Sequence, residues 1–85
     1  MDKADFIKSY LAPLMWALDP EIEEIRLIER PNSRREIIAI KHKDSVSFEH
    51  INITDNSNEK IALVAVLFVI NHLENKRRNP PLGQA

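Results

Sequence analysis

Ten consecutive apolar residues, at positions 61–70, constrain most strongly what this chain can fold into. A helix on a protein surface needs only one apolar stripe, with polar residues on its opposite side. A segment that is apolar on all sides needs burial on most of them, and a chain of 85 residues has little material to supply it. The run therefore predicts contact with a second protein surface, either another copy of the chain or a different partner.

The run alone does not distinguish a helix from a buried strand, since five of its ten residues are β-branched. Its flanks favour the helix. Asn56 and Glu59 match a capping pair at a helix start near 55–57, and the basic residues at 76–78 suit the negative end of a helix dipole. The sequence thus predicts a helix from about 56 to about 76, longer than a normal strand. Its apolar part is only about half of the ~20 residues that span a bilayer.

Residues 3–18 predict another helix, with apolar side chains every four positions at Phe6, Tyr10, Leu14 and Leu18. Pro13 cannot donate a hydrogen bond to the carbonyl of Ser9, so we expect a kink or a helix in two parts. Asp19 precedes Pro20 and is pushed out of the helical region, which ends the helix there.

Three strands are predicted between the helices, at 24–29, 36–41 and 45–49. Proline and asparagine in the segment 30–34 indicate a turn between the first two strands. Val46 and Phe48 occupy even positions, whereas the next apolar pair, at 51 and 53, is odd. One strand cannot place both pairs on the same face, so we expect a bulge near 49–50. The three strands form an antiparallel meander.

The predicted fold class is α+β: a helix, a three-stranded antiparallel meander and a second helix, with both helices on one face of the sheet. Residues 1–76 form this single domain, and residues 77–85 form a basic, proline-containing flexible tail. One flank of the second helix is left apolar, and we expect it to form a two-fold homodimer interface through Ala62, Val66, Val69 and Leu73. The alternative is a monomer in which the kinked first helix covers this flank.

Catalysis is not expected from this composition. The chain has no cysteine and a single glycine, which excludes thiol nucleophiles, thiolate metal sites and glycine-rich phosphate loops. His42, His50 and His72 lack any ligand spacing, so they are interpreted as surface or structural histidines. We therefore expect no catalytic residue, no metal site and no cofactor.

The basic residues give two hypotheses about partners. Arg30, Asn32, Arg34 and Arg35 crowd the first turn and form a predicted partner-binding surface for another protein. Together with the cluster at 76–78 they could instead contact nucleic acid, the less favoured alternative, because twelve basic and thirteen acidic residues nearly cancel.

The predicted function is that of a small non-catalytic protein-interaction module, homodimeric and with a further protein partner. Size and element order, though no motif, are shared with small accessory proteins of phages and mobile elements, including inhibitors that bind a host protein. The N-terminus lacks the basic start and apolar stretch of a signal peptide, and the chain lacks cysteine, so a cytoplasmic location without a membrane partner is expected.

Overall fold

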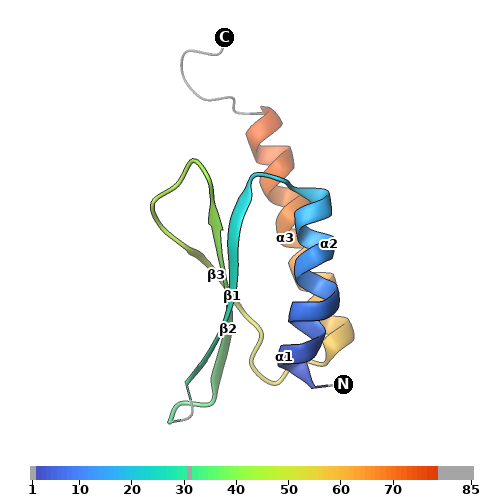
Figure 1. The fold of residues 1–85 in the computed structure, drawn as a ribbon, viewed down its shortest axis with the longest axis vertical. Helices are drawn as coiled ribbons and strands as arrows, with labels where there is room; N and C mark the ends of the chain where they lie inside the picture. The colour runs from blue at the N-terminus through green and yellow to red at the C-terminus, as the bar shows by residue number, and fades with distance from the viewer. Residues whose placement is uncertain (1, 31, 79–85) are drawn as a thin grey trace.

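Two helical segments pack on one face of a three-stranded sheet in this computed structural model, which describes residues 2–30 and 32–78 (Figure 1). The chain order is α1 (Lys3–Phe6), a π-helical turn η1 (Ile7–Leu11), α2 (Ala12–Leu18), β1 (Ile22–Arg30), β2 (Arg35–His42), β3 (Glu49–Asn52) and α3 (Asn58–Arg78). The predicted α+β class and the order of helix, three strands and helix are confirmed.

The first helix is continuous from α1 to α2 but changes its winding at η1. The backbone N–H of Ala12 donates to the carbonyl of Ile7, five residues earlier, instead of four. This wide turn lies directly before Pro13, which stands at the start of α2 and has no N–H to donate. The predicted irregularity at the proline is therefore confirmed as a π-helical turn. Asp19 then adopts an extended backbone and ends the helix, as expected before a proline.

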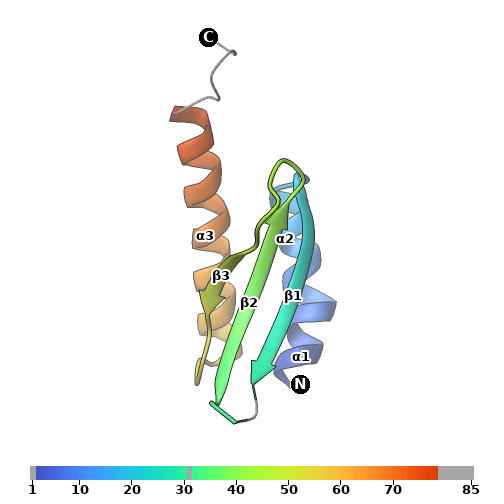
Figure 2. The same cartoon turned by 90° about the vertical axis from the view of Figure 1, so that its left-hand side faces the viewer.

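The sheet is an antiparallel meander in the order β1-β2-β3. Ile38 on the central strand pairs with Leu27 of β1 and with Ile51 of β3, so all three side chains share one face. Both helices cover that face, and Figure 2 shows the opposite face free of helices. The core between the layers includes the fully buried residues Leu11, Met15, Ile38, Ile40, Ile53, Ile61 and Val69.

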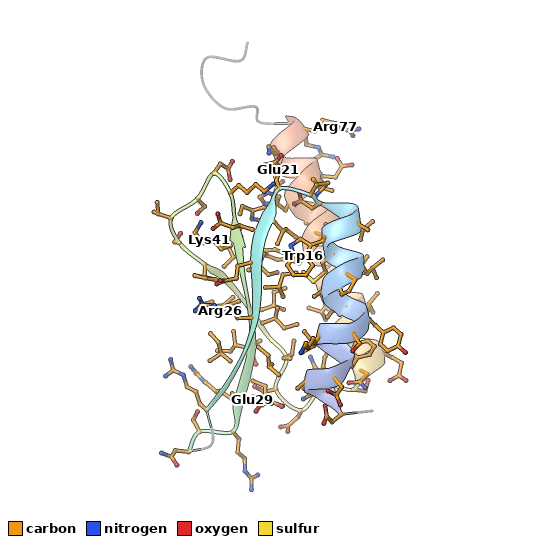
Figure 3. All side chains as sticks on the ribbon, viewed as in Figure 1. Trp16, Glu21, Arg26, Glu29, Lys41 and Arg77 are labelled. Atoms are coloured by element: carbon orange, nitrogen blue, oxygen red, sulfur yellow. The ribbon has the colours of Figure 1, made fainter. Side chains whose placement is uncertain are left out.

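Polar side chains lie on the other face of the sheet. Figure 3 shows Arg26 and Lys41 on the side away from the helices. The guanidinium of Arg26 lies 5.1 Å from the ring centre of Phe48, and Lys41 forms an ion pair with Glu23. Trp16 on α2 is 40% exposed, and its Nε1–H donates to the carbonyl of Ile22 at 3.0 Å. This bond attaches the end of the first helix to the start of β1.

The third strand lies later in the chain than predicted. Ser45 and Ser47 bond to one another locally, with the Ser47 N–H donating to Ser45 Oγ at 3.2 Å, and residues 46–47 form a bend. Val46 is 99% exposed in this bend. The strand begins at Glu49, so the change of apolar parity marks the start of β3 rather than a bulge. The register shift in the sheet is in β1 instead, between Ile22 and Glu24.

Helix α3 begins one residue after Ser57, whose Oγ accepts the backbone N–H of Lys60 at 3.2 Å. The predicted cap at Asn56 was therefore one residue too early. The helix ends at Arg78, two residues beyond the predicted domain end; positions 79–85 of the predicted tail lie outside the described residues. Among the described helices, none combines the length and apolarity needed to cross a membrane.

Lys3 at the start of α1 forms an ion pair with Glu36 on β2, which ties the first helix to the sheet. The hydrogen bond from Lys3 lowers the pKa of Glu36 from its ordinary value of 4.5, against a smaller rise from burial; the Lys3 charge and the Asp55 backbone N–H lower it further. The ionised Glu36 side chain therefore stabilises the fold at pH values above its pKa in the unfolded state. This stabilisation is lost as the pH falls through its pKa in the folded state.

We expect Glu36→Gln to reduce the free energy of unfolding at pH 7 by about 0.5 kcal/mol, since the pair is partly exposed. The difference from the wild type should shrink below pH 4.5 and vanish once the wild-type carboxyl is protonated. Urea unfolding of the wild type and of Glu36→Gln over a pH series measures this difference in the free energy of unfolding. Lys3→Met is the reciprocal variant. A difference that grows as the pH falls would contradict the assignment.

Candidate functional site

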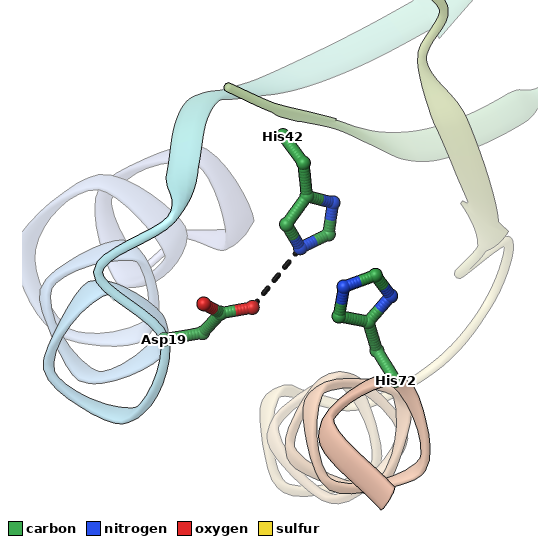
Figure 4. Close-up of side chains that lie close together, drawn as sticks. All are labelled: Asp19, His42 and His72. Atoms are coloured by element: carbon green, nitrogen blue, oxygen red, sulfur yellow. Dashed lines mark hydrogen bonds and ion pairs between the residues drawn. The ribbon is translucent and has the colours of Figure 1, made fainter. Parts of the chain in front are cut away.

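Asp19, His42 and His72 come from three different elements and point toward one another at one end of the core (Figure 4). Asp19 follows α2, His42 is the last residue of β2, and His72 lies in the C-terminal half of α3. One nitrogen or oxygen atom from each of them lies within 4.8 Å of the other two. We call these three residues the Asp–His–His cluster.

The carboxylate of Asp19 is held in place from both sides. Its Oδ1 accepts the backbone N–H of Glu21 at 3.1 Å, and its Oδ2 lies 3.0 Å from Nε2 of His42. The residue is only 2% exposed, although a carboxylate is costly to remove from water without a hydrogen-bonding partner. The chain turn that Pro20 enforces after α2 therefore delivers an acidic group into the core, where His42 is its side-chain partner.

The ring of His42 lies between two carboxylates. Its alternation with Ile38 and Ile40 along β2 turns it toward the core, where it is 3% exposed. Its Nε2 faces Asp19, and its Nδ1 lies 3.7 Å from Oε1 of Glu49, the first residue of β3. Each ring nitrogen thus has an acidic neighbour.

The ring of His72 stacks on that of His42, with ring centres 3.9 Å apart and an angle of 15° between the planes. His72 continues the spacing of the buried residues Ile61, Ala65 and Val69, so it lies on the face of α3 that packs against the sheet. It is half-buried, and hence the most accessible member of the cluster.

The histidines were interpreted from the sequence as surface or structural residues, and the sequence did not predict that two of them are in contact. His50 is exposed on β3, but His42 and His72 meet in the core. A signal was present in the sequence. His42 continues the two-residue spacing of the buried isoleucines along β2, and His72 continues the helical spacing of the buried residues of α3. Asp19 could not be found by either period, since it lies in a turn.

A second candidate feature is the solvent-facing side of the helical layer, formed by side chains between 37% and 59% exposed: Tyr10, Leu14, Leu18, Leu63, Leu67, Ile70 and Leu73. We call these residues the outer helical face. The predicted homodimer interface coincides with it only in part. Leu73 belongs to it, Ala62 and Val66 are half-buried, and Val69 is 1% exposed in the core, where it cannot contact another molecule.

The predicted partner-binding turn joins β1 to β2, and its residues Arg30, Asn32, Arg34 and Arg35 are all exposed. It borders an open pocket of about 480 Å³ whose described lining consists of Arg30, Arg34 and Arg35 together with Glu29, Glu36 and Asp55. Three acidic residues thus balance the three arginines. Figure 3 shows Glu29, beside this turn, and Arg77 of the second basic cluster at opposite ends of the molecule.

The Asp–His–His cluster offers two imidazoles and a carboxylate, which can share protons or hold a cation. The outer helical face offers apolar area for a protein contact. No protein-family model, curated protein sequence or solved structure matches this chain, so its function is inferred from these two features of its own geometry.

Proposed function

We propose that this chain is a non-catalytic protein-interaction module that forms a homodimer through its outer helical face. The observation that carries the proposal is the row of large apolar side chains exposed along α3: Leu63, Leu67, Ile70 and Leu73. Monomeric proteins rarely expose contiguous apolar patches of more than a few hundred square ångströms.

The row has the geometry of a helix–helix contact. Its members are spaced by four, three and three residues, which places them on one stripe of the helix. The stripe lies opposite the buried one formed by Ile61, Ala65 and Val69. One side of α3 therefore packs in the core, and the other side is exposed and could contact a partner. Tyr10, Leu14 and Leu18 on the first helix are exposed large apolar side chains as well.

The charges at the two ends of the stripe favour a second copy, packed antiparallel, as the occupant. Lys60 precedes the stripe and Glu74 follows it, at equal distances in sequence from Leu67. A two-fold axis beside Leu67 therefore brings Lys60 of each copy against Glu74 of the other. The same axis brings Glu59 toward the basic residues that follow Glu74. A parallel pairing would set like charges side by side, which is destabilising.

The size of the surface also suits a dimer. Helix α3 has 21 residues and is about 31 Å long at 1.5 Å per residue. Two helices side by side make a face about 20 Å wide, of the order needed to bury the ~800 Å² per partner of a stable interface. Nucleic-acid binding finds less support, because the two predicted basic clusters lie at opposite ends of the molecule and acidic residues balance the arginine turn.

Light scattering over a concentration series tests the homodimer. The chain has a mass of 9.8 kDa, so a dimer has about twice that mass. We expect Leu67→Glu to weaken dimerisation at least about a hundredfold, because the two-fold axis brings two glutamates together in an apolar contact. Val46→Glu is the matched control: Val46 is 99% exposed on the β2–β3 connection, so the same substitution there should leave the mass unchanged.

Two results would refute the proposal. One is a wild-type chain that stays monomeric at the highest concentration. The other is a dimer that Leu67→Glu leaves intact, which would place the interface on another surface. Circular dichroism of both variants establishes that a loss of mass reflects dissociation and not unfolding.

A further inference from the structure

We propose that the Asp–His–His cluster binds a divalent transition-metal ion of the zinc class. Asp19, His42 and His72 supply one oxygen and two nitrogen ligands, from three elements, with all three atoms within 4.8 Å of one another. A tetrahedral ion with bonds of about 2.0–2.1 Å holds its ligand atoms about 3.3 Å apart. Asp19 Oδ2 and His42 Nε2 are 3.0 Å apart, close to that separation, and a tilt of the His42 ring would direct its lone pair at an ion beside the line that joins them.

The burial of the cluster makes a cation favourable. Asp19 and His42 are 2% and 3% exposed, so the carboxylate lies where water solvates it poorly. A buried carboxylate is stabilised by pairing or by coordinating a metal. The Asp19 side chain is also oriented before any ion arrives, because the Glu21 N–H holds its other oxygen.

Each ring nitrogen of His42 has a carboxylate neighbour. A ligating imidazole binds the metal through one nitrogen and donates the N–H of the other to a carboxylate or a carbonyl, which fixes the tautomer. Here Nε2 faces Asp19, and Nδ1 lies 3.7 Å from the carboxylate of Glu49. At this distance Glu49 is a charged neighbour of the ring, and it would have to move closer to accept the Nδ1–H.

His72 is the ligand that must move. Its ring is stacked on His42, and two stacked imidazoles do not direct their in-plane lone pairs at a common point. The proposal requires the His72 side chain to rotate out of the stack, so that one of its nitrogens, now within 4.8 Å of the other two ligand atoms, reaches the Asp19–His42 pair. His72 is the least buried of the three residues and is therefore the one whose ring can turn.

The ligand set indicates which metal and which role. Imidazole and carboxylate without thiolate suit Zn²⁺ and its neighbours Co²⁺ and Ni²⁺. The bound ion joins the end of α2, the end of β2 and the C-terminal half of α3. It would therefore fasten α3, and with it the outer helical face, to the rest of the fold. Three protein ligands leave a fourth position for water.

Titration of the untagged chain with Co²⁺, followed by visible absorption, tests the site. We expect one Co²⁺ per chain, with the intense bands of tetrahedral coordination and with displacement by Zn²⁺. A hundredfold excess of Zn²⁺ over its dissociation constant should raise the thermal midpoint by about 10 °C or more relative to the chain in EDTA. Two variants remove a ligand but spare the fold. His72→Phe keeps a ring to stack on His42, and Asp19→Asn keeps the oxygen that accepts the Glu21 N–H.

Both variants should bind Co²⁺ at least about a hundredfold more weakly than the wild type. This loss exceeds the loss expected when a residue that only supports a metal ligand is removed. Their unfolding midpoints in EDTA establish that the fold survives. His50→Ala is the matched control, since it removes the third histidine from an exposed position and should bind as the wild type does. Equal binding by all four proteins, or no binding by the wild type, would overturn the proposal and leave the cluster as a hydrogen-bonded core pair.

Discussion

Val69→Glu is expected to abolish the folded state of this chain. Val69 is 1% exposed between α3 and the sheet, so the substitution buries a carboxylate with no partner designed for it. The cost is several kcal/mol, comparable to the ~5–15 kcal/mol total stability of a small domain. We expect no cooperative thermal transition and no near-ultraviolet circular dichroism. The milder Val69→Ala should lower the free energy of unfolding by about 2 kcal/mol.

The neighbouring Ile70→Glu provides the control. Ile70 is 45% exposed and lies about 100° around the helix from Val69, outside the buried stripe, so the same substitution there should leave the monomer folded. Urea unfolding at low protein concentration separates this effect from any change in association. If both glutamate variants unfold, the helix is packed on more sides than the structure has it; if neither does, its buried stripe is assigned to the wrong residues.

His42→Ala is expected to lower the free energy of unfolding by about 3 kcal/mol, measured in urea with EDTA present. Two effects combine: the substitution leaves a cavity beside His72, and it removes the side-chain partner of the buried Asp19 carboxylate. His50→Ala, at an exposed position, should change the same quantity by less than about 0.5 kcal/mol.

A double-mutant cycle separates the two effects. In the background of Asp19→Asn no charge is left stranded, so the loss caused by His42→Ala should fall by more than about 1 kcal/mol. The asparagine side chain of that variant keeps an oxygen for the Glu21 N–H, which preserves the turn. An unchanged loss would show that His42 stabilises the core by packing alone and that its bond to Asp19 contributes nothing.

The parts of the fold that sequence predicted well are those set by local chemistry. Pro13 and Pro20 fixed the irregularity and the end of the first helix, because proline lacks an N–H and restricts the residue before it. Alternation along β1 and β2 gave two of the three strands. The third was misplaced because the alternation of Val46 and Phe48 resembles a strand. The structure instead has a local turn, in which the Ser45 N–H donates to the His42 carbonyl and the Ser47 N–H donates to Ser45 Oγ.

The orientation of α3 was predicted less well, since a segment apolar on every side does not show which side docks. Val69 was assigned to the interface and lies in the core. The polar residues on either side of the apolar run at 61–70 indicate which side of the helix is exposed. Lys60, Asn71 and Glu74 lie on the same side of the helix as Leu63 and Leu67, and they mark that side as the exposed one.

The Asp–His–His cluster needed the tertiary structure. The period of two on β2 and the helical period on α3 place His42 and His72 on inward faces, but neither tells that the two rings meet. The contact between the two rings depends on how far α3 is shifted along its own axis relative to the sheet. Asp19 reaches them only because the first helix ends at the level of the two rings, and no local pattern encodes this agreement.

The two edge strands of the sheet are built in a way that disfavours the addition of strands from other copies of the chain. A sheet edge offers unpaired backbone groups that can recruit strands without limit. Strand β3 has four residues, and β1 carries a charge at five of its nine positions and a register shift near its start. Both are natural protections against edge-to-edge aggregation. An isologous contact between helices closes after two molecules, whereas strand addition does not close. Polymerisation is thus opposed at the sheet edges, whereas the pairing proposed for the outer helical face would end at two molecules.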